Sequence, residues 1–292
     1  MTTYSNIVVV TQDKLTAVKQ PALPFAPVDY QQKYQDDVNN VLRLYFNQIN
    51  ALISQLKLSA TNTLSLPYGA FHQDGTTTLS VGITNNSTTP ISVASTVGFP
   101  SSGYILIGSE LIQYTGITST TFTGITRGTL GTTQAAHNAG DAVSEAQGTG
   151  SGTTIGSLLF TATDYSNGVT VDPANNGHII FSQTGTYNIA LSAQALNFTN
   201  NADNVTIWIR KNSADVATTA SIGTVSAIHG GVAGAAIISY NIFLQVVAGD
   251  YISVKWTTDS GNSVIATYPP GISPVHPTSP AIILTANFVS GA

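Results

Sequence analysis

The sequence contains no cysteine and few charged residues. The absence of cysteine excludes disulfides, thiol nucleophiles and cysteine-ligated metals. Asp, Glu, Lys and Arg together make up 8% of the chain, whereas soluble domains typically contain about 25%. A surface with so little charge has to be solvated by Ser, Thr, Asn and backbone groups. Because many residues are also β-branched, this composition indicates packed β-structure rather than disorder.

A basic surface and a long apolar segment are missing as well. The formal net charge is −5 and basic residues do not cluster after position 60, so we expect no nucleic-acid partner. The longest apolar run near the N-terminus is Ile7 to Val10. It is too short to span a bilayer or to form the apolar part of an ordinary secretory signal. We therefore expect no membrane partner.

The motifs of common catalytic chemistries are also missing. The chain has no G-x-S-x-G, H-E-x-x-H or phosphate-loop motif, and its five histidines never pair at metal-ligand spacing. We expect no catalytic residue, no metal site and no cofactor. A polysaccharide-cleaving enzyme, which needs two carboxylates, is a less favoured alternative. Its candidate carboxylates are Asp203, Asp215, Asp250 and Asp259, most of them beside turn residues, where Asp commonly bonds backbone amides.

Residues 1–60 are predicted to form an extended arm followed by one long helix. Pro21, Pro24 and Pro27 recur at every third position, which favours extended chain over residues 1–27. A helix is predicted over residues 28–60, with Asp29 as its N-cap. The helix packs either on its own domain or between chains, and its place in front of the β region favours packing between chains or against a larger assembly. Its apolar contact positions are Val38, Val41, Leu42, Tyr45, Phe46, Ile49, Leu52, Ile53 and Leu56.

From Leu64 onward the pattern changes to short strands with alternating apolar residues. Examples are Tyr187, Ile189, Leu191 and Ala193, then Ile252, Val254 and Trp256, with turn residues between such runs. Period-two patterning with this punctuation predicts an antiparallel β-sandwich or barrel. Gly148 to Gly152 is predicted to be a hinge, and the five prolines of Tyr268 to Pro280 predict a long ordered loop.

Segments of the C-terminal part carry a more specific pattern. They are Phe181-Ser-Gln-Thr-Gly185-Thr-Tyr187, Ile207-Trp-Ile-Arg210-Lys-Asn212, Val247-Ala-Gly249-Asp250, Ala286-Asn-Phe288 and, earlier, Pro67-Tyr-Gly-Ala-Phe71. The pattern resembles the trimeric jelly-roll heads of the C1q and tumour-necrosis-factor type, in the form found in tailed-phage structural proteins. The resemblance implies a head formed by residues 64–76 and 148–292. Phe181, Tyr187, Trp256 and Phe288 are expected in its core, with Gly185 allowing a sharp turn into the Tyr187 strand.

The residues between these two segments resemble a small β-module that recurs in virion proteins of tailed phages. The landmarks are Ile91-Ser-Val-Ala-Ser-Thr-Val-Gly98-Phe-Pro100, Gly103-Tyr-Ile-Leu-Ile-Gly108 and Thr126-Arg127-Gly128. We expect an inserted module over residues 77–147 that forms a second lobe.

Together these resemblances imply a non-enzymatic phage virion protein on the particle surface. The partners they imply are further copies of the chain in a homotrimer and another virion protein, the major capsid or a tail protein. The protein either decorates the capsid, which we favour, or serves as a fibre or knob that adsorbs to a host-surface glycan. Side chains expected to face outward for recognition are Trp208, Tyr251, Tyr268 and His276.

Overall fold

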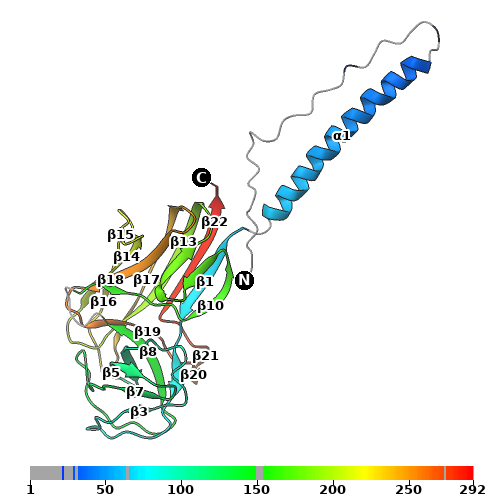
Figure 1. Cartoon of the computed structure of the whole chain (residues 1–292). Coiled ribbons are helices and arrows are strands. Elements are labelled where there is room, and N and C mark those ends of the chain that lie inside the picture. The colour runs from blue at the N-terminus through cyan, green and yellow to red at the C-terminus, as the bar shows by residue number, and fades with distance from the viewer. Residues whose placement is uncertain are drawn as a thin grey trace. The chain divides into compact units, whose positions relative to one another are not determined.

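The computed structural model describes residues 22, 29, 32–63, 66–148, 154–272 and 274–291, with the backbone alone for residues 55–63. The chain divides into two compact units, Met1–Leu66 and Pro67–Ala292. The first contains the one described helix and the second contains the strands (Figure 1).

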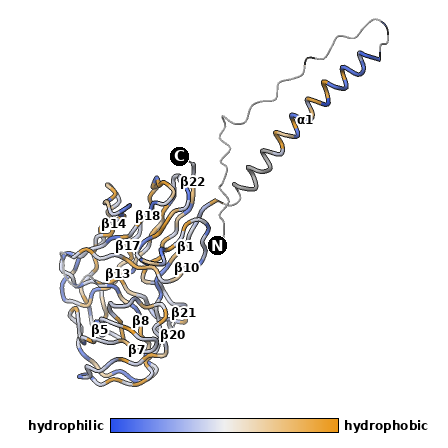
Figure 2. Tube along the Cα trace, viewed as in Figure 1, coloured by the Kyte–Doolittle hydropathy of each residue, from blue (hydrophilic) through white to orange (hydrophobic). Residues whose placement is uncertain are grey.

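The helix α1 spans Gln32–Thr63. The predicted N-cap at Asp29 stays a prediction, because residues 30 and 31, between Asp29 and the first described residue of the helix, lie outside the described part of the chain. Apolar and polar residues alternate along α1 turn by turn (Figure 2). None of its described side chains is buried, and Leu44, Phe46 and Ile53 are the most exposed apolar ones. No helix in the described part of the chain is long and apolar enough to cross a membrane.

The second unit is an antiparallel, jelly-roll-like sandwich, so the predicted fold class is confirmed. The first sheet contains the strands β10, β1, β22 and β13 in that order, with β17 on the free side of β13. Here β10 spans Ala162–Asn167, β1 Tyr68–Gln73, β22 Ile282–Ser290, β13 Gly185–Asn197 and β17 Gly234–Val246.

The second sheet has the order β11, β12, β18, β14, and β14 also pairs with β15 and β16 while β18 pairs with β9. The bounds are as follows: β11 spans Val169–Asp172, β12 Asn175–Phe181, β18 Tyr251–Thr258, β14 Asp203–Lys211, β15 Ala214–Asp215, β16 Ser221–Val225 and β9 Gly156–Ser157.

The sandwich core lies between the inward side chains of these two sheets. Phe181, Tyr187 and Trp256 are fully buried there, and the partly buried Phe288 contacts Tyr187 edge-on with ring centroids 5.4 Å apart. Gly185 has a different role from the predicted sharp turn. It starts β13 without a left-handed backbone conformation, and a Cβ there would lie 2.3 Å from a ring carbon of Phe288. The residue is glycine because the Phe288 ring occupies the space of a side chain.

The first sheet continues into residues 76–148. Beyond the segment of β13 that pairs with β22, Ala195–Asn197 pairs with β19 (Ser263–Ala266), and β8 (Ala142–Gly148), β4 (Gly103–Ile107) and β5 (Glu110–Tyr114) follow. The remaining strands here are β2 (Thr76–Thr78), β3 (Ile91–Ser92), β6 (Gly116–Ile117) and β7 (Thr121–Thr123). Residues Leu79 to Val143 enclose a hydrophobic cluster of their own. A third cluster, which includes Tyr104, Leu196 and Val264, joins these strands to the sandwich.

The proline-rich segment Tyr268 to Pro280 contains a small hairpin of β20 (Gly271–Ile272) and β21 (Val275–His276), so the prediction that it has no strand was wrong. Its prolines lie outside the paired positions, which leaves the ladder amides free to bond. Of the predicted hinge, Gly148 ends β8 and the remaining residues lie outside the described part of the chain.

Candidate functional site

Three adjacent strands of the first sheet carry an outer surface without ionic side chains. No residue of β17, β13 or β22 is Asp, Glu, Lys, Arg or His. Their outward positions define what we call the uncharged face: Thr186, Asn188, Ala190, Ser192 and Gln194, then Ala235, Ile237, Ser239, Asn241, Phe243 and Gln245, then Ile283, Thr285 and Asn287.

Large apolar side chains project from this face. Ile237 is 69% exposed, Phe243 66% and Ile283 41%. In the strand register they lie opposite Gln194, Asn188 and Ser192, respectively. A partner on this face would therefore cover apolar area beside neutral hydrogen-bonding groups, and no charge would have to leave water.

The strand β17 is also an edge. Among the described residues it pairs only with β13, along Gly185 to Asn197. Exposed edges are usually protected by Lys, Pro or a bulge. The strand β17 contains neither Lys nor Pro and its register with β13 is continuous, although Lys211 of β14 donates to the Gln245 carbonyl near its end. Such an edge can add a strand or a packed surface from another chain.

A shallow pocket of about 270 Å³ lies at one end of the uncharged face. Its lining includes Gln194, Ala235, Ile237 and Tyr268.

Ionic side chains are found on the other side of the same sheet, on and beside β1 and β10. There, His72 lies between two carboxylates, with Nε2 3.2 Å from Asp74 Oδ2 and Nδ1 3.2 Å from Asp164 Oδ2.

A buried ion pair organises the loops of residues 79–143. Arg127 Nε and Nη2 donate to the two oxygens of Glu110 at 2.6 and 2.8 Å, and His137 Nε2 lies 2.8 Å from Glu110 Oε2. Arg127 also donates to the backbone carbonyls of Thr84 and Ala135. Burial raises the pKa of Glu110, but the hydrogen bonds from Arg127, His137 and the Ala135 amide outweigh it and hold that pKa below its ordinary value. Every group of this cluster is used to hold loops together.

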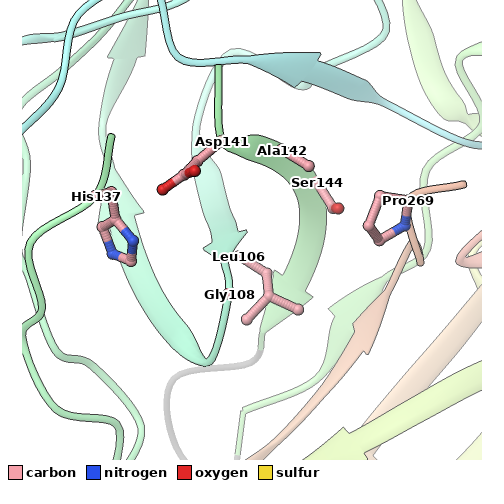
Figure 3. Close-up of a pocket in the computed structure, with 7 residues that line it drawn as sticks. All are labelled: Leu106, Gly108, His137, Asp141, Ala142, Ser144 and Pro269. Atoms are coloured by element: carbon pink, nitrogen blue, oxygen red, sulfur yellow. The ribbon is translucent and has the colours of Figure 1, made fainter. Parts of the chain in front are cut away.

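A pocket of about 350 Å³ lies beside this ion pair. His137 and Asp141 lie on one side of it and Pro269 on the other (Figure 3). The Asp141 carboxylate accepts the Asn138 amide at 2.8 Å, and His137 is bonded to Glu110. Both side chains therefore hold loops in place.

A second buried carboxyl has no such partners. Glu145 is fully buried, and among the described residues neither of its side-chain oxygens forms a well-placed hydrogen bond. The same is true of Gln73 Oε1 and Gln147 Nε2 beside it. Burial raises the pKa of Glu145 well above its ordinary value, and the nearby Gln73 and Gln147 amides oppose this only in part. Gln73 ends β1, and Glu145 and Gln147 lie on β8, where residues 74–141 join the sandwich.

The residues predicted to face outward do not form one site. Trp208 and Tyr251 are half-buried on the outer side of the second sheet. Tyr268 packs against the third hydrophobic cluster, and burial raises its pKa. His276 is exposed on β21. Only Trp208 and Tyr251 share a surface.

The carboxylates considered for polysaccharide cleavage are all hydrogen-bonded. Asp203 accepts the Ser260 and Ser263 amides at 3.0 and 3.1 Å, and Asp250 accepts the Val247 amide at 2.8 Å. Asp259 accepts Asn204 Nδ2, and Asp215 accepts Arg210 and Trp208. These are roles in turns and side-chain pairs. In the described part of the chain, no group of three or more His, Cys, Asp or Glu side chains could hold a metal ion.

No protein-family model matches this chain, and no curated protein matches it. The features of the uncharged face therefore have to be interpreted from its own chemistry. Sequence reasoning missed this face, although a signal existed, since three predicted strands lack all ionic residues. It also missed Glu145, because nothing in the sequence reveals that this carboxyl is buried.

Proposed function

We propose that this protein is a non-enzymatic structural protein of a bacteriophage particle. In this proposal it acts as a homotrimer on the particle surface, where it decorates or cements the capsid. The observation that carries the self-association is the uncharged face, with exposed Ile237, Phe243 and Ile283 next to the free edge of β17. The virion location rests on the resemblance of the sequence to tailed-phage proteins.

Physical reasons favour a closed ring of copies. An edge strand and the neighbouring sheet face are different surfaces, so contact between them is heterologous, and such contacts must close into a ring or extend into a fibre. A stable interface needs about 800 Å² per partner, and burial of apolar surface contributes roughly 25 cal/mol per Å². Three copies form the smallest such ring, which agrees with the trimer that the resemblance implies.

In the same proposal, residues 1–60 attach the trimer to the particle. Several apolar side chains of α1 are exposed, including Leu44 and Phe46. Three arms and three helices per trimer would bind the shell together, and such multivalent attachment can be tight although each contact is weak. The major capsid protein is the preferred partner, with a tail protein as the alternative in a fibre or knob.

The test of self-association compares two isoleucines of equal exposure on opposite sheets. Ile237 is 69% exposed on the uncharged face, and Ile222 on β16 is 68% exposed. We expect I237D to convert the trimer to monomer at micromolar concentration, because each interface would then bury a carboxylate. I222D should leave the trimer intact. Sedimentation equilibrium measures both, and a wild-type chain that is monomeric at that concentration contradicts the proposal.

The virion assignment has a separate test. Quantitative mass spectrometry of purified particles counts the copies per particle. Hundreds of copies support decoration, and a small multiple of the tail symmetry supports a fibre. A trimer that is absent from particles would retain the self-association and overturn the virion role. Incubation with host polysaccharide, followed by a reducing-end assay, tests the less favoured enzyme alternative, and released sugar would contradict a non-enzymatic role.

A further inference from the structure

Two cations of the sandwich lie on the outer side of the second sheet, and a third lies at the end of β14 and contacts the first sheet. Residues 67–292 contain Arg127, Arg210, Lys211 and Lys255 as their basic side chains. Arg127 is buried in its ion pair, and the other three lie on β14 and β18. This is the sheet opposite the one that carries the uncharged face.

Two of these cations flank a tryptophan. In the register of β14 and β18, Trp208 lies opposite Lys255 and Arg210 lies opposite Ser253. Asp215 on β15 accepts Trp208 Nε1 at 2.6 Å and Arg210 Nε at 2.8 Å. The hydrogen bonds from Arg210 and then Trp208 lower the pKa of Asp215. One carboxylate thus fixes both the indole and the guanidinium.

The turn that carries Asp215 is strained and braced. Asn212 and Ser213 have φ values of 46° and 69°, a left-handed conformation that costs free energy for residues other than glycine. Asn212 Nδ2 donates to Asp250 Oδ1 at 2.6 Å, and Ser213 Oγ lies 2.7 Å from the Tyr251 hydroxyl. These bonds tie the turn to the start of β18, and β15 itself pairs with β14, with Asp215 opposite Arg210. Asp215, Trp208 and Arg210 are therefore arranged before any ligand arrives.

The charges around the indole do not balance. Beside the indole, Arg210 and Lys255 share the carboxylate of Asp215, which leaves one positive charge in excess there. At the Tyr251 end, Asp250 lies 3.5 Å from Lys211, and Asp172 lies 3.7 Å from His178. Lys255 Nζ donates to Ser157 Oγ. Burial, and then the nearby Arg210, lower the pKa of Lys255, as expected for a cation that lacks a full counter-charge.

A second aromatic group lies on the same side of the sheet. Tyr251 stacks on His178 with ring centroids 4.1 Å apart. Tyr251 is four residues from Lys255 along β18, which corresponds to about 13 Å. The surface is therefore an elongated strip with Tyr251 at one end, Arg210 in the middle, and Trp208 beside Lys255 at the other end.

We propose that this strip binds a linear oligosaccharide that carries carboxylate groups. Sugar rings have apolar faces that pack on indole and phenol rings, and a ring carboxylate would supply the negative charge that Arg210 and Lys255 lack. A neutral glycan would leave that charge unmatched, while a nucleic acid would need a longer basic track. This inference does not depend on self-association, because the strip lies on the other sheet.

Isothermal titration calorimetry of the full chain with a galacturonic acid tetramer tests the proposal. The fully methyl-esterified tetramer is the matched control, because it keeps the rings and removes the charge. We expect saturable binding of the acid form and at least about tenfold weaker binding of the ester. Trp256 is 1% exposed, so a ligand-dependent change in tryptophan fluorescence should come from Trp208.

Variants locate the site. W208A and K255M should each weaken binding of the acid tetramer about tenfold, the loss of one good contact. Two controls should bind like the wild type. Y165A removes a tyrosine that is 70% exposed on β10 in the other sheet. K211M removes a lysine whose Nζ donates to the Gln245 carbonyl instead.

Three outcomes would overturn the proposal. They are the absence of saturable binding by a folded wild-type chain, equal binding of acid and ester, and unchanged binding by W208A and K255M. Thermal melting of each variant establishes that it is folded. If W208A is unfolded, K255M and the fluorescence titration of the wild type decide the question.

Discussion

At the scale of single residues, the state of one proton decides whether a buried cluster is satisfied. Glu145 Oε1 and Oε2, Gln73 Oε1 and Gln147 Nε2 are three acceptors and one donor without partners. Protonation of Glu145 adds a hydroxyl donor for Gln73 Oε1, while Gln147 can donate to the remaining oxygen. Buried polar groups are rarely left unpaired, so we expect Glu145 to be neutral in the folded protein.

This expectation gives a pH dependence with a definite sign. The pKa of Glu145 is raised in the folded chain, so its contribution to stability is complete below its ordinary value of 4.5 and is lost as pH rises toward the folded-state pKa. E145Q keeps a neutral side chain and does not titrate. Relative to E145Q, the wild type should lose about a factor of ten in folding equilibrium constant for each pH unit in that interval.

Urea unfolding of both proteins between pH 5 and 8 measures this difference. Groups that titrate in both proteins cancel in the comparison. A stability difference that is independent of pH would show that Glu145 is ionised, or paired, in the folded chain.

At the scale of elements, α1 and β17 both expose surface that another surface can cover. An amphipathic helix exposes an apolar side, and an edge strand exposes unpaired backbone groups, here beside exposed apolar side chains. No described side chain of α1 is buried, so a single charge on its apolar side should cost the second unit no stability. Such a charge should instead weaken the contact between the helix and the surface that covers it.

We therefore expect I49D to weaken self-association of the chain while the melting temperature of the β unit stays within error of the wild type. Ile49 is one of the partly exposed residues of the apolar side, and the exposed Asn47 provides a control at N47D. Sedimentation equilibrium and differential scanning calorimetry report the two quantities. Equal association of both variants would exclude α1 from the interface between copies.

At the scale of the whole molecule, the sandwich has two chemically different faces. The first sheet offers three strands without ionic residues, and the second carries Arg210, Lys211 and Lys255. Association through the first sheet would leave the second directed away from the partner copies. This polarity allows one chain to combine assembly with recognition of a ligand.

The division into two compact units gives a further prediction. Deletion of residues 1–27 should abolish attachment to the particle and leave a folded β unit, because residues 67–292 contain their own hydrophobic clusters. Circular dichroism establishes folding, and immunoblotting of purified particles measures attachment. Normal incorporation of the truncated chain would show that the arm is not the anchor.

The sequence by itself determined that a long helix precedes a strand-rich region, and which side of the five longest strands faces inward, namely β13, β14, β17, β18 and β22. Alternation at Tyr187, Ile189, Leu191 and Ala193 predicts β13 with these residues in the core, and all four are buried. This works because a strand's side chains alternate with a fixed period of two, which is a local property of the backbone. The long helix was likewise predicted from a local property, apolar residues that recur with the period of a helix.

Only the tertiary structure decided which residues meet across the fold. Trp208 and Tyr251 share a surface because β14 and β18 pair, while Tyr268 and His276 lie elsewhere. The space beside Gly185 is filled by the ring of Phe288, which lies more than a hundred positions further along the chain. The burial of Glu145, and hence its proton, follows from β8 lying between β2 and β19, where the Gly75 carbonyl accepts the Glu145 amide. Contacts between residues distant in sequence depend on strand order and register, which no local pattern specifies.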